Sequence, residues 1–243
     1  MSNPILNEKF TERTTVIDGA TMTVNGTLQA AMILGFLVLA AASFVWSRFA
    51  AGYADLANML TYGGAIAGFI SALIVCFTRN KHLTLVYAVC EGCFLGGVSF
   101  MFEAGFPGIV SQAVLGTFTA LFTMLVLYRT GLIRCTEKFR SVILIATISV
   151  ALVYLINFIG SFFHYAVPFI NAADNSNAGI IVTAVIVVLA ALNLILDFDF
   201  IERGSQMMLP KDMEWYGAFG LMVTIVWLYL EILKLLAKAK SRR

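Results

Sequence analysis

Seven long apolar stretches constrain the fold of this chain more than any other feature of its sequence. They cover residues 28–46, 56–77, 83–102, 109–128, 142–163, 179–198 and 215–237. A helix rises about 1.5 Å per residue, so each stretch is long enough to cross a hydrocarbon core of about 30 Å. The connections between them are short, which favours antiparallel packing of sequence neighbours.

The composition indicates that much of the surface faces lipid. Of the 243 residues, 60% are hydrophobic and 12% are charged, whereas soluble domains are about 45–50% apolar and about 25% charged. In lipid the backbone polar groups must pair internally, which leaves helices or closed barrels. Barrel strands would be about 10 residues long and alternating. The sequence therefore predicts an all-α integral membrane protein, a bundle of seven transmembrane helices.

Three regions follow from this pattern. Residues 1–27 are polar and contain no apolar core of a signal peptide, so we expect a partly disordered cytoplasmic tail followed by a retained signal anchor. Residues 28–237 form the seven-helix transmembrane domain, and residues 238–243 form a basic tail.

Lysine and arginine residues near the ends of the spans predict the orientation, because cytoplasmic loops carry an excess of both. The richer side holds Lys9, Arg13, Arg79, Lys81, Arg129, Arg134, Lys138, Arg140, Arg203 and Lys211. This places the N-terminus in the cytoplasm and the C-terminus outside. The basic tail after residue 237 opposes this assignment, and would be satisfied if the last segment re-entered or failed to cross.

Ionisable residues at membrane depth are the candidates for function, because burying them in lipid is costly. Glu91 lies within the third span with no basic residue on its helix face at that depth. It must be protonated, paired with another helix or facing water. The plainer alternative is a structural hydrogen bond between helices.

Two aspartates close the sixth span. Residues two apart do not share a helix face, so one of Asp197 and Asp199 should point into the bundle and the other toward the interface. Asn193 precedes Asp197 by about one turn and could share its site. A solvated helix end, with Gly204 as the stop signal, is the alternative.

Glu231 lies within the last span, and Lys234 three residues later could pair with it. No zinc spacing, nucleophile–base set or phosphate-binding loop appears, and nothing indicates nucleic acid. We therefore expect no enzyme, no resident metal and no cofactor.

Three motifs in order resemble the transmembrane Bax inhibitor motif family, also called Bax inhibitor-1/YccA-like. Asp197-Phe-Asp-Phe-Ile201 is similar to its D-T-Q-L-I pattern, with the middle changed. Leu228-Tyr-Leu-Glu231 is similar to L-Y-L-D, with glutamate for aspartate, and Glu91-Gly-Cys-Phe-Leu-Gly96 is similar to E-G-x-x-L-G. The resemblance covers all seven spans in number and order.

The resemblance implies a central helix enclosed by six others and a pH-sensitive calcium leak across the membrane. In the family two aspartates share a proton and gate the pore, and the matching positions here are Asp197 and Glu231. Glu91 is the alternative partner of Asp197, and Asp199 and Asn193 would support the ion pathway. Ca²⁺ and H⁺ would be the ions involved, Ca²⁺ being a permeant ion and not a cofactor.

A second hypothesis comes from another class of function. The chain could be a regulatory protein that binds other membrane proteins, such as proteases or death regulators, with structural acids and no transport. With no targeting signal and a bacterial character to the resemblance, we expect a multi-pass protein of the plasma (bacterial inner) membrane.

Overall fold

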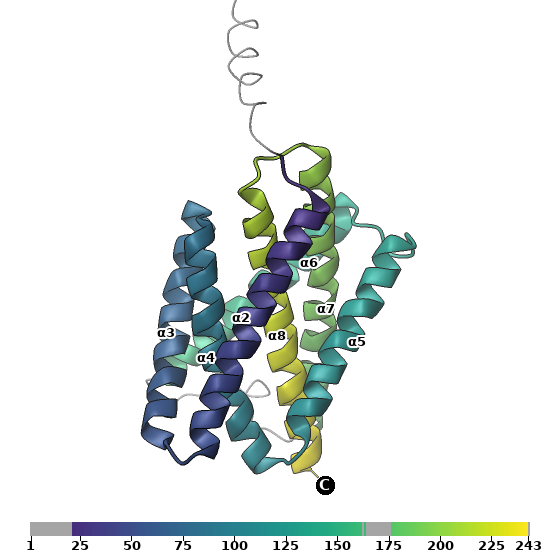
Figure 1. Cartoon of the computed structure of the whole chain (residues 1–243). Coiled ribbons are helices and arrows are strands. Elements are labelled where there is room, and N and C mark those ends of the chain that lie inside the picture. Colours follow the sequence, from purple (N-terminus) through teal and green to yellow (C-terminus); the bar gives the residue numbers. More distant parts are fainter. Residues whose placement is uncertain (1–20, 162, 164–175, 243) are drawn as a thin grey trace, which may run out of the picture.

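The computed structural model describes residues 21–161, 163 and 176–242, and within them it has seven helices long and apolar enough to cross a membrane. They are α2 (Val24–Ala50), α3 (Ala54–Thr78), α4 (Lys81–Gly105), α5 (Ile109–Arg129), α6 (Glu137–Ser161), α7 (Asn177–Gln206) and α8 (Met213–Ser241). In Figure 1 most of them run side by side as long rods, whereas α6 crosses behind the others at a steep tilt.

Side chains that accept hydrogen bonds from free backbone N–H groups fix where several helices begin. The Thr23 hydroxyl accepts from the Gly26 N–H, and the Asn80 side chain accepts from the His82 N–H. Ser176 does the same at the start of α7. Gly108 precedes α5 with a φ of 79°, a left-handed conformation that glycine adopts without strain.

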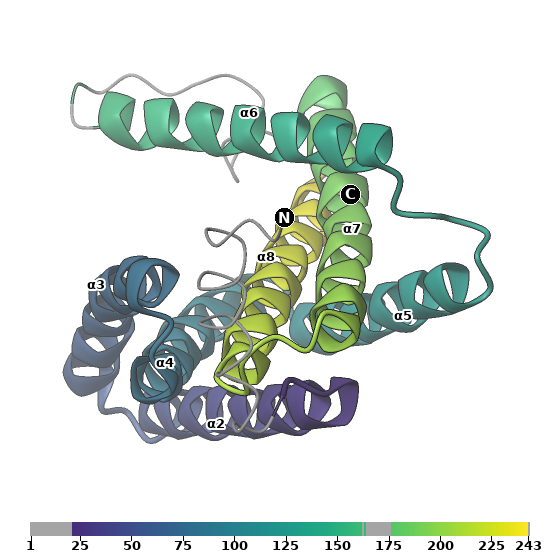
Figure 2. The same ribbon diagram turned by 90° about the horizontal axis from the view of Figure 1, so that it is seen from above.

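The last helix, α8, lies at the centre of the bundle. It packs against α2, α4, α5 and α7, and its strongest neighbour is α7. Viewed along the bundle, α8 runs between α2 on one side and α7 on the other, while α6 packs on α7 (Figure 2). The structure therefore confirms the seven-helix fold and has a central helix, as the resemblance implies.

Glycines let α4 approach its two neighbours closely. A Cβ on Gly92 would lie 2.5 Å from the Val38 carbonyl oxygen of α2, and a Cβ on Gly64 of α3 would lie 2.6 Å from the Cys90 carbonyl oxygen. Small residues at such contacts replace the hydrophobic driving force that helices lack in lipid. The glycines of the Glu91–Gly96 motif thus face α2, where Gly96 meets Ala42.

Residues 21–23, which we call the strap, cover the end of the bundle where α2 begins. Thr21 pairs with Pro210 in an isolated antiparallel bridge, and the Met22 N–H donates to the Leu209 carbonyl at 2.7 Å. Glu214 then accepts hydrogen bonds from both the backbone N–H and the hydroxyl of Thr23, at 3.0 and 2.9 Å. These contacts tie the first helix to the connection between the last two.

The helices extend past the predicted spans at nearly every end, and α7 differs most. It continues to Gln206, so the alternative interpretation, in which Gly204 stops the helix, is wrong on this point. Gly204 is buried inside α7, and a Cβ there would lie 2.7 Å from the Met22 sulfur. Gly204 therefore makes room for the strap, and Met208 beyond the helix adopts the left-handed conformation, with a φ of 51°.

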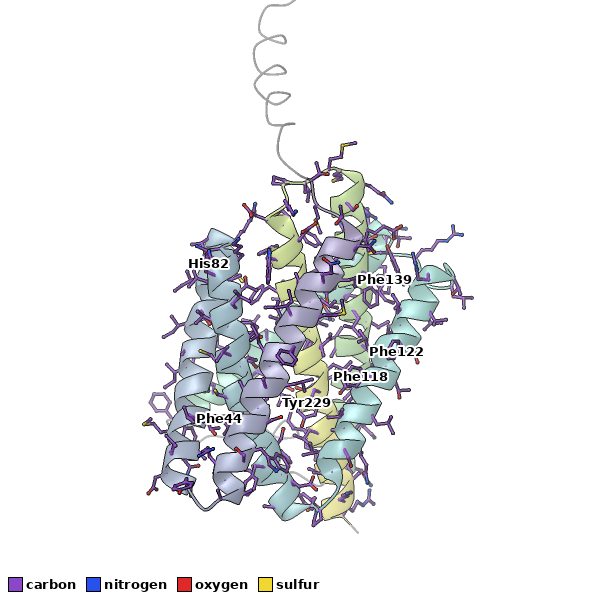
Figure 3. All side chains as sticks on the ribbon, viewed as in Figure 1. Phe44, His82, Phe118, Phe122, Phe139 and Tyr229 are labelled. Carbon is purple, nitrogen blue, oxygen red and sulfur yellow. The ribbon has the colours of Figure 1, made fainter. Side chains whose placement is uncertain are left out.

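The outer surface is apolar along the length of the bundle. Large side chains such as Phe44 and Phe122 lie on it, with half or more of their area exposed (Figure 3). α8 is one continuous helix that ends at the opposite face of the bundle from the start of α2 (Figure 1). Re-entry of the last segment is therefore not seen, and the chain is a multi-pass membrane protein.

Candidate functional site: carboxyl groups on the central helices

Asp197 lies on α7 against the central helix α8. Its carboxylate neighbours the Thr224 hydroxyl and lies 3.7 Å from the position a Cβ would take on Gly220. The Oδ2 atom is buried and has no hydrogen-bond partner among the described residues. A buried carboxyl oxygen left without a partner is costly, and this marks Asp197 as a candidate for function.

Glu231 is the most tightly held of the candidate acids. It is 1% exposed, and its Oε1 atom accepts hydrogen bonds from three donors. These are the Lys234 Nζ at 2.5 Å, the Tyr154 hydroxyl at 2.8 Å and the Trp227 Nε1 at 3.2 Å. Oε2 is buried without a partner among the described residues. Because Tyr154 belongs to α6, this cluster joins α6 to α8.

The structure places Asp197 of α7 and Glu231 of α8 at different heights along the axis of α8. Asp197 faces Gly220 and Thr224, and Glu231 lies two turns beyond Thr224, about 10 Å farther along the axis. In the part of the chain that the structure describes, no hydrogen bond joins the two carboxyls. A direct proton-sharing contact between them would need α7 and α8 to shift, and it stays a prediction.

Glu91 lies on the other side of α4, toward α3. A Cβ on Gly68 would lie 3.2 Å from its Oε2, so the absence of a side chain at Gly68 makes space for the acid. Glu91 interacts electrostatically with Tyr87 and Cys90 on its own helix. The alternative Asp197–Glu91 pair likewise stays a prediction.

Asp199 belongs to an ion-pair network at the end of the bundle and is itself only 6% exposed. Its Oδ2 lies 2.6 Å from the Arg140 Nη2 of α6 and 2.9 Å from the Arg203 Nε one turn later on α7. Arg203 also donates to the Cys135 carbonyl at 3.1 Å and pairs with Glu137 at 3.4 Å. Burial raises the pKa of the Cys135 thiol above its ordinary value. The network fastens the connection between α5 and α6 to α7.

Asn193 joins α7 to α6 and does not touch Asp197 among the described contacts. Its Nδ2 donates to the Thr147 hydroxyl at 2.8 Å and to the Leu189 carbonyl at 2.9 Å. Its Oδ1 accepts from the same hydroxyl at 3.2 Å. Asn193 and Tyr154 thus add two polar links to α6, beside its ion pairs from Arg140 and Glu137 to α7.

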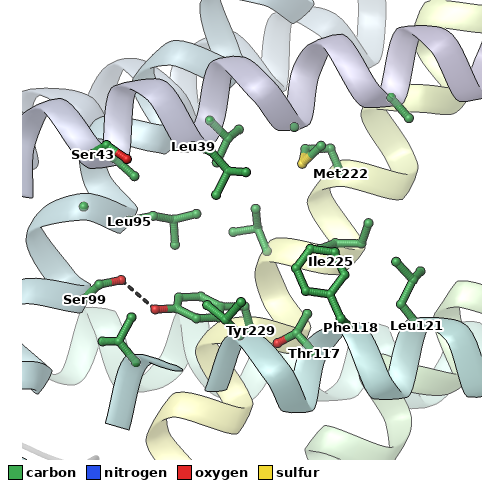
Figure 4. Close-up of a pocket in the computed structure, with 18 of the residues that line it drawn as sticks. Leu39, Ser43, Leu95, Ser99, Thr117, Phe118, Leu121, Met222, Ile225 and Tyr229 are labelled. Carbon is green, nitrogen blue, oxygen red and sulfur yellow. Dashed lines mark hydrogen bonds between the residues drawn. The ribbon is translucent and has the colours of Figure 1, made fainter. Parts of the chain in front are cut away.

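The side of α8 facing α2 and α5 is different in character. A cavity of about 470 Å³ lies there, with almost wholly apolar walls. One polar contact crosses its wall, between the hydroxyls of Ser99 on α4 and Tyr229 on α8 at 2.7 Å (Figure 4). Because it has no charged lining residue and few polar groups, a hydrated cation entering it would lose water contacts with little compensation.

The described residues contain no group of three His, Cys, Asp or Glu side chains that could hold a metal ion. The acids are instead spread over α4, α7 and α8. Such an arrangement can exchange protons and can offer single oxygen ligands to a passing cation, because Ca²⁺ takes carboxylate, hydroxyl, carbonyl and water oxygens.

The model of the family described as Bax inhibitor 1 like matches residues 3–241, nearly the whole chain. The chain belongs to the Bax inhibitor 1 like family. No curated protein and no solved structure matches it. The family resemblance deduced from three short motifs is therefore confirmed across the full transmembrane domain.

In this Bax inhibitor 1 like chain the three motifs meet different neighbours. The Leu228–Glu231 motif supplies Tyr229 to α4 and Glu231 to α6, from opposite sides of the central helix. The Asp197–Ile201 motif supplies Asp197 to α8 and Asp199 to the ion-pair network. Each motif thus binds two or more helices together.

Sequence reasoning predicted Lys234 as a partner of Glu231, which the structure confirms at 2.5 Å, and missed the other partners of the acids. Three of the missed residues contact a candidate acid: Tyr154 and Trp227 contact Glu231, and Arg140 contacts Asp199. The fourth, Glu214, is itself a buried acid. The contact of Trp227 could have been predicted, because Trp227 lies four residues before Glu231 on the same helix face. Tyr154 and Arg140 come from α6, and only the packing of α6 on α7 brings them near.

Proposed function

We propose that this protein is a pH-sensitive cation leak channel, with Ca²⁺ as the permeant ion and the buried carboxyls of α7 and α8 as its gate. The proposal is carried by two buried oxygens that have no hydrogen-bond partner among the described residues, Asp197 Oδ2 and Glu231 Oε2. Both lie at or beside the central helix of a bundle that spans the membrane.

Asp197 is the titrating group in this proposal, because no cation neutralises it among the described residues. Glu231, by contrast, has Lys234 at 2.5 Å. When the pH rises and Asp197 loses its proton, a bare negative charge lies between α7 and α8. Water and a hard cation then stabilise that charge, with Thr224 as a neighbouring oxygen ligand.

The sign of the pH dependence follows from this charge. At low pH the carboxyl is neutral, α7 and α8 stay packed, and the leak is small. At high pH the charge draws in water, and the leak increases. If the carboxyls of Asp197 and Glu231 come into contact in another conformation, the two titrate as a pair and neither residue has an individual pKa.

Calcium flux into proteoliposomes loaded with an indicator dye tests the proposal, across about pH 6 to 8. We expect the wild-type flux to rise with pH above that of empty liposomes. Glu231→Gln and Glu91→Gln show which second carboxyl takes part, since the true partner should alter the pH profile. A flux equal to that of empty liposomes at every pH would contradict the channel.

The alternative is a regulatory protein that binds other membrane proteins without transport. The observation favouring it is that Glu231 and Asp199 are both ion-paired, as structural charges are. In that case neutral substitutions at Asp197 should be silent in every flux measurement.

We further propose a plasma-membrane location with a cytoplasmic N-terminus, supported by the basic residues at the end of the bundle where α2 begins.

A further inference from the structure

A polar pocket of about 370 Å³ lies at the end of the bundle where α5 stops and α6 begins, away from the gating carboxyls. It is lined by Tyr128, Arg129, Ile133, Arg134, Cys135, Asp199 and Glu202. The connection from α5 forms one wall, and the last turns of α7 form the other. The proposed function leaves this pocket without a role.

The two acids of the pocket are already engaged. Asp199 is paired with Arg140 and Arg203. The Oε2 of Glu202 accepts a hydrogen bond of 2.5 Å from the Tyr128 hydroxyl. Asp199 therefore needs no further cation from outside, while Glu202 is held by a neutral hydroxyl and keeps its negative charge.

The two arginines of the connection are not engaged. The side chains of Arg129 and Arg134 have no hydrogen-bond or ion-pair partner among the described residues, although both residues line the pocket. Gly131 between them has a φ of 71°, and this left-handed turn folds the chain back so that both arginines border one space. The pocket thus presents two free guanidinium groups beside Asp199, which is ion-paired, and Glu202, which is held by the Tyr128 hydroxyl.

We propose that this pocket binds a phosphate group, held by Arg129 and Arg134. Planar guanidinium groups match phosphate oxygens with paired hydrogen bonds, so two of them facing one polar space suit this anion. Counting Arg129, Arg134, Arg140 and Arg203 against Glu137, Asp199 and Glu202 leaves one positive charge, which complements a singly charged phosphodiester. Leu132 in the same connection is 75% exposed and could face acyl chains.

Such a phosphate could belong to the headgroup of an anionic phospholipid or be free in solution. The test uses the full-length protein in detergent and measures its thermal unfolding midpoint with increasing phosphatidylglycerol, phosphatidylcholine or inorganic phosphate. A ligand that binds the folded state raises the midpoint according to its concentration and affinity. Phosphatidylcholine carries similar acyl chains but no net charge, so it controls for binding through the chains.

The variant for this test is Arg129→Gln/Arg134→Gln, and the matched control is Lys81→Gln/Lys211→Gln. The control removes the same two charges from the same end of the bundle, at exposed residues outside the pocket. We expect the pocket variant to weaken binding of the phosphate ligand about tenfold or more, and the control to stay within about twofold. Arg129→Lys/Arg134→Lys keeps the charge but loses the paired hydrogen bonds, and should fall between them.

A midpoint shift with phosphatidylglycerol alone assigns the site to a lipid headgroup, and a shift with inorganic phosphate assigns it to the free anion. Either result supports the proposal when Arg129→Gln/Arg134→Gln removes it. The proposal is overturned if neither ligand shifts the wild-type midpoint, if phosphatidylcholine acts as strongly, or if the control variant loses as much. Because no step requires calcium flux, a failed channel proposal would leave this result standing.

Discussion

At the scale of single residues, the interior charge on Glu231 depends on Lys234, Tyr154 and Trp227, all bound to one carboxylate oxygen. Glu231→Gln would leave Lys234 as an uncompensated charge, with its side chain only 23% exposed. Because removing one member of a buried pair strands the other, we expect a loss of about 2–4 kcal/mol in the free energy of unfolding. Thermal unfolding in detergent measures this.

The control for Glu231→Gln is the double variant Glu231→Gln/Lys234→Gln, in which no charge remains. It should recover part of the lost stability, because the cycle of single and double variants isolates the interaction between the two residues. If Glu231→Gln alone were as stable as the wild type, the pair would contribute nothing and the ion-paired arrangement of Glu231 would be wrong.

At the scale of elements, the contact between α3 and α4 depends on one face of α3. A Cβ on Gly64 would lie 2.6 Å from the Cys90 carbonyl oxygen, whereas a Cβ on Gly63 would meet nothing within 4 Å. Gly64→Ala should therefore destabilise the protein by about 1–3 kcal/mol through overpacking. Gly63→Ala adds the same atom one residue away, and should be neutral or slightly stabilising.

Thermal unfolding of these two neighbouring variants tests the packing of α3 on α4 directly. Equal midpoints for Gly63→Ala and Gly64→Ala would show that the close approach does not exist in the membrane. The same pair of glycines shows what sequence alone could establish. The small residues of the second span predict close packing, yet they do not say which glycine faces α4.

Much of the fold could be predicted because span length and hydrophobicity depend on local sequence. The seven helices follow from the apolar stretches, and even the position of Glu91 beside two packing glycines follows from one motif. The ends of α7 could not be predicted, because Gly204 lies inside the helix only to accommodate Met22, which is 182 residues earlier in the chain.

The candidate site was predictable in its acids and, among their partners, only in Lys234 beside Glu231. Asp197, Asp199 and Glu231 were identifiable as charges in apolar surroundings. Their neighbours Arg140 and Tyr154 come from α6, and depend on how that helix packs on α7. Motif matching suggests that Asp197 and Glu231 are paired, while the structure separates them by about two turns of α8.

At the scale of the whole molecule, seven crossings put the two ends of the described chain on opposite faces (Figure 1). In a chain without its four native cysteines, we introduce a single cysteine at Gly52 or at Lys211, both exposed in connections at opposite ends. A thiol reagent that cannot cross membranes should label Gly52→Cys in intact cells, and Lys211→Cys only after permeabilisation. The reverse labelling would contradict the proposed orientation.

The pH dependence of calcium flux in Asp197→Asn tests the central claim most directly. Wild-type proteoliposomes should leak more at about pH 8 than at about pH 6, because Asp197 then carries a charge. Asp197→Asn cannot lose a proton, so its flux should be low and the same at both pH values, while Asp55→Asn, an exposed control at the start of α3, should behave as the wild type. A wild-type pH profile in Asp197→Asn would contradict the account.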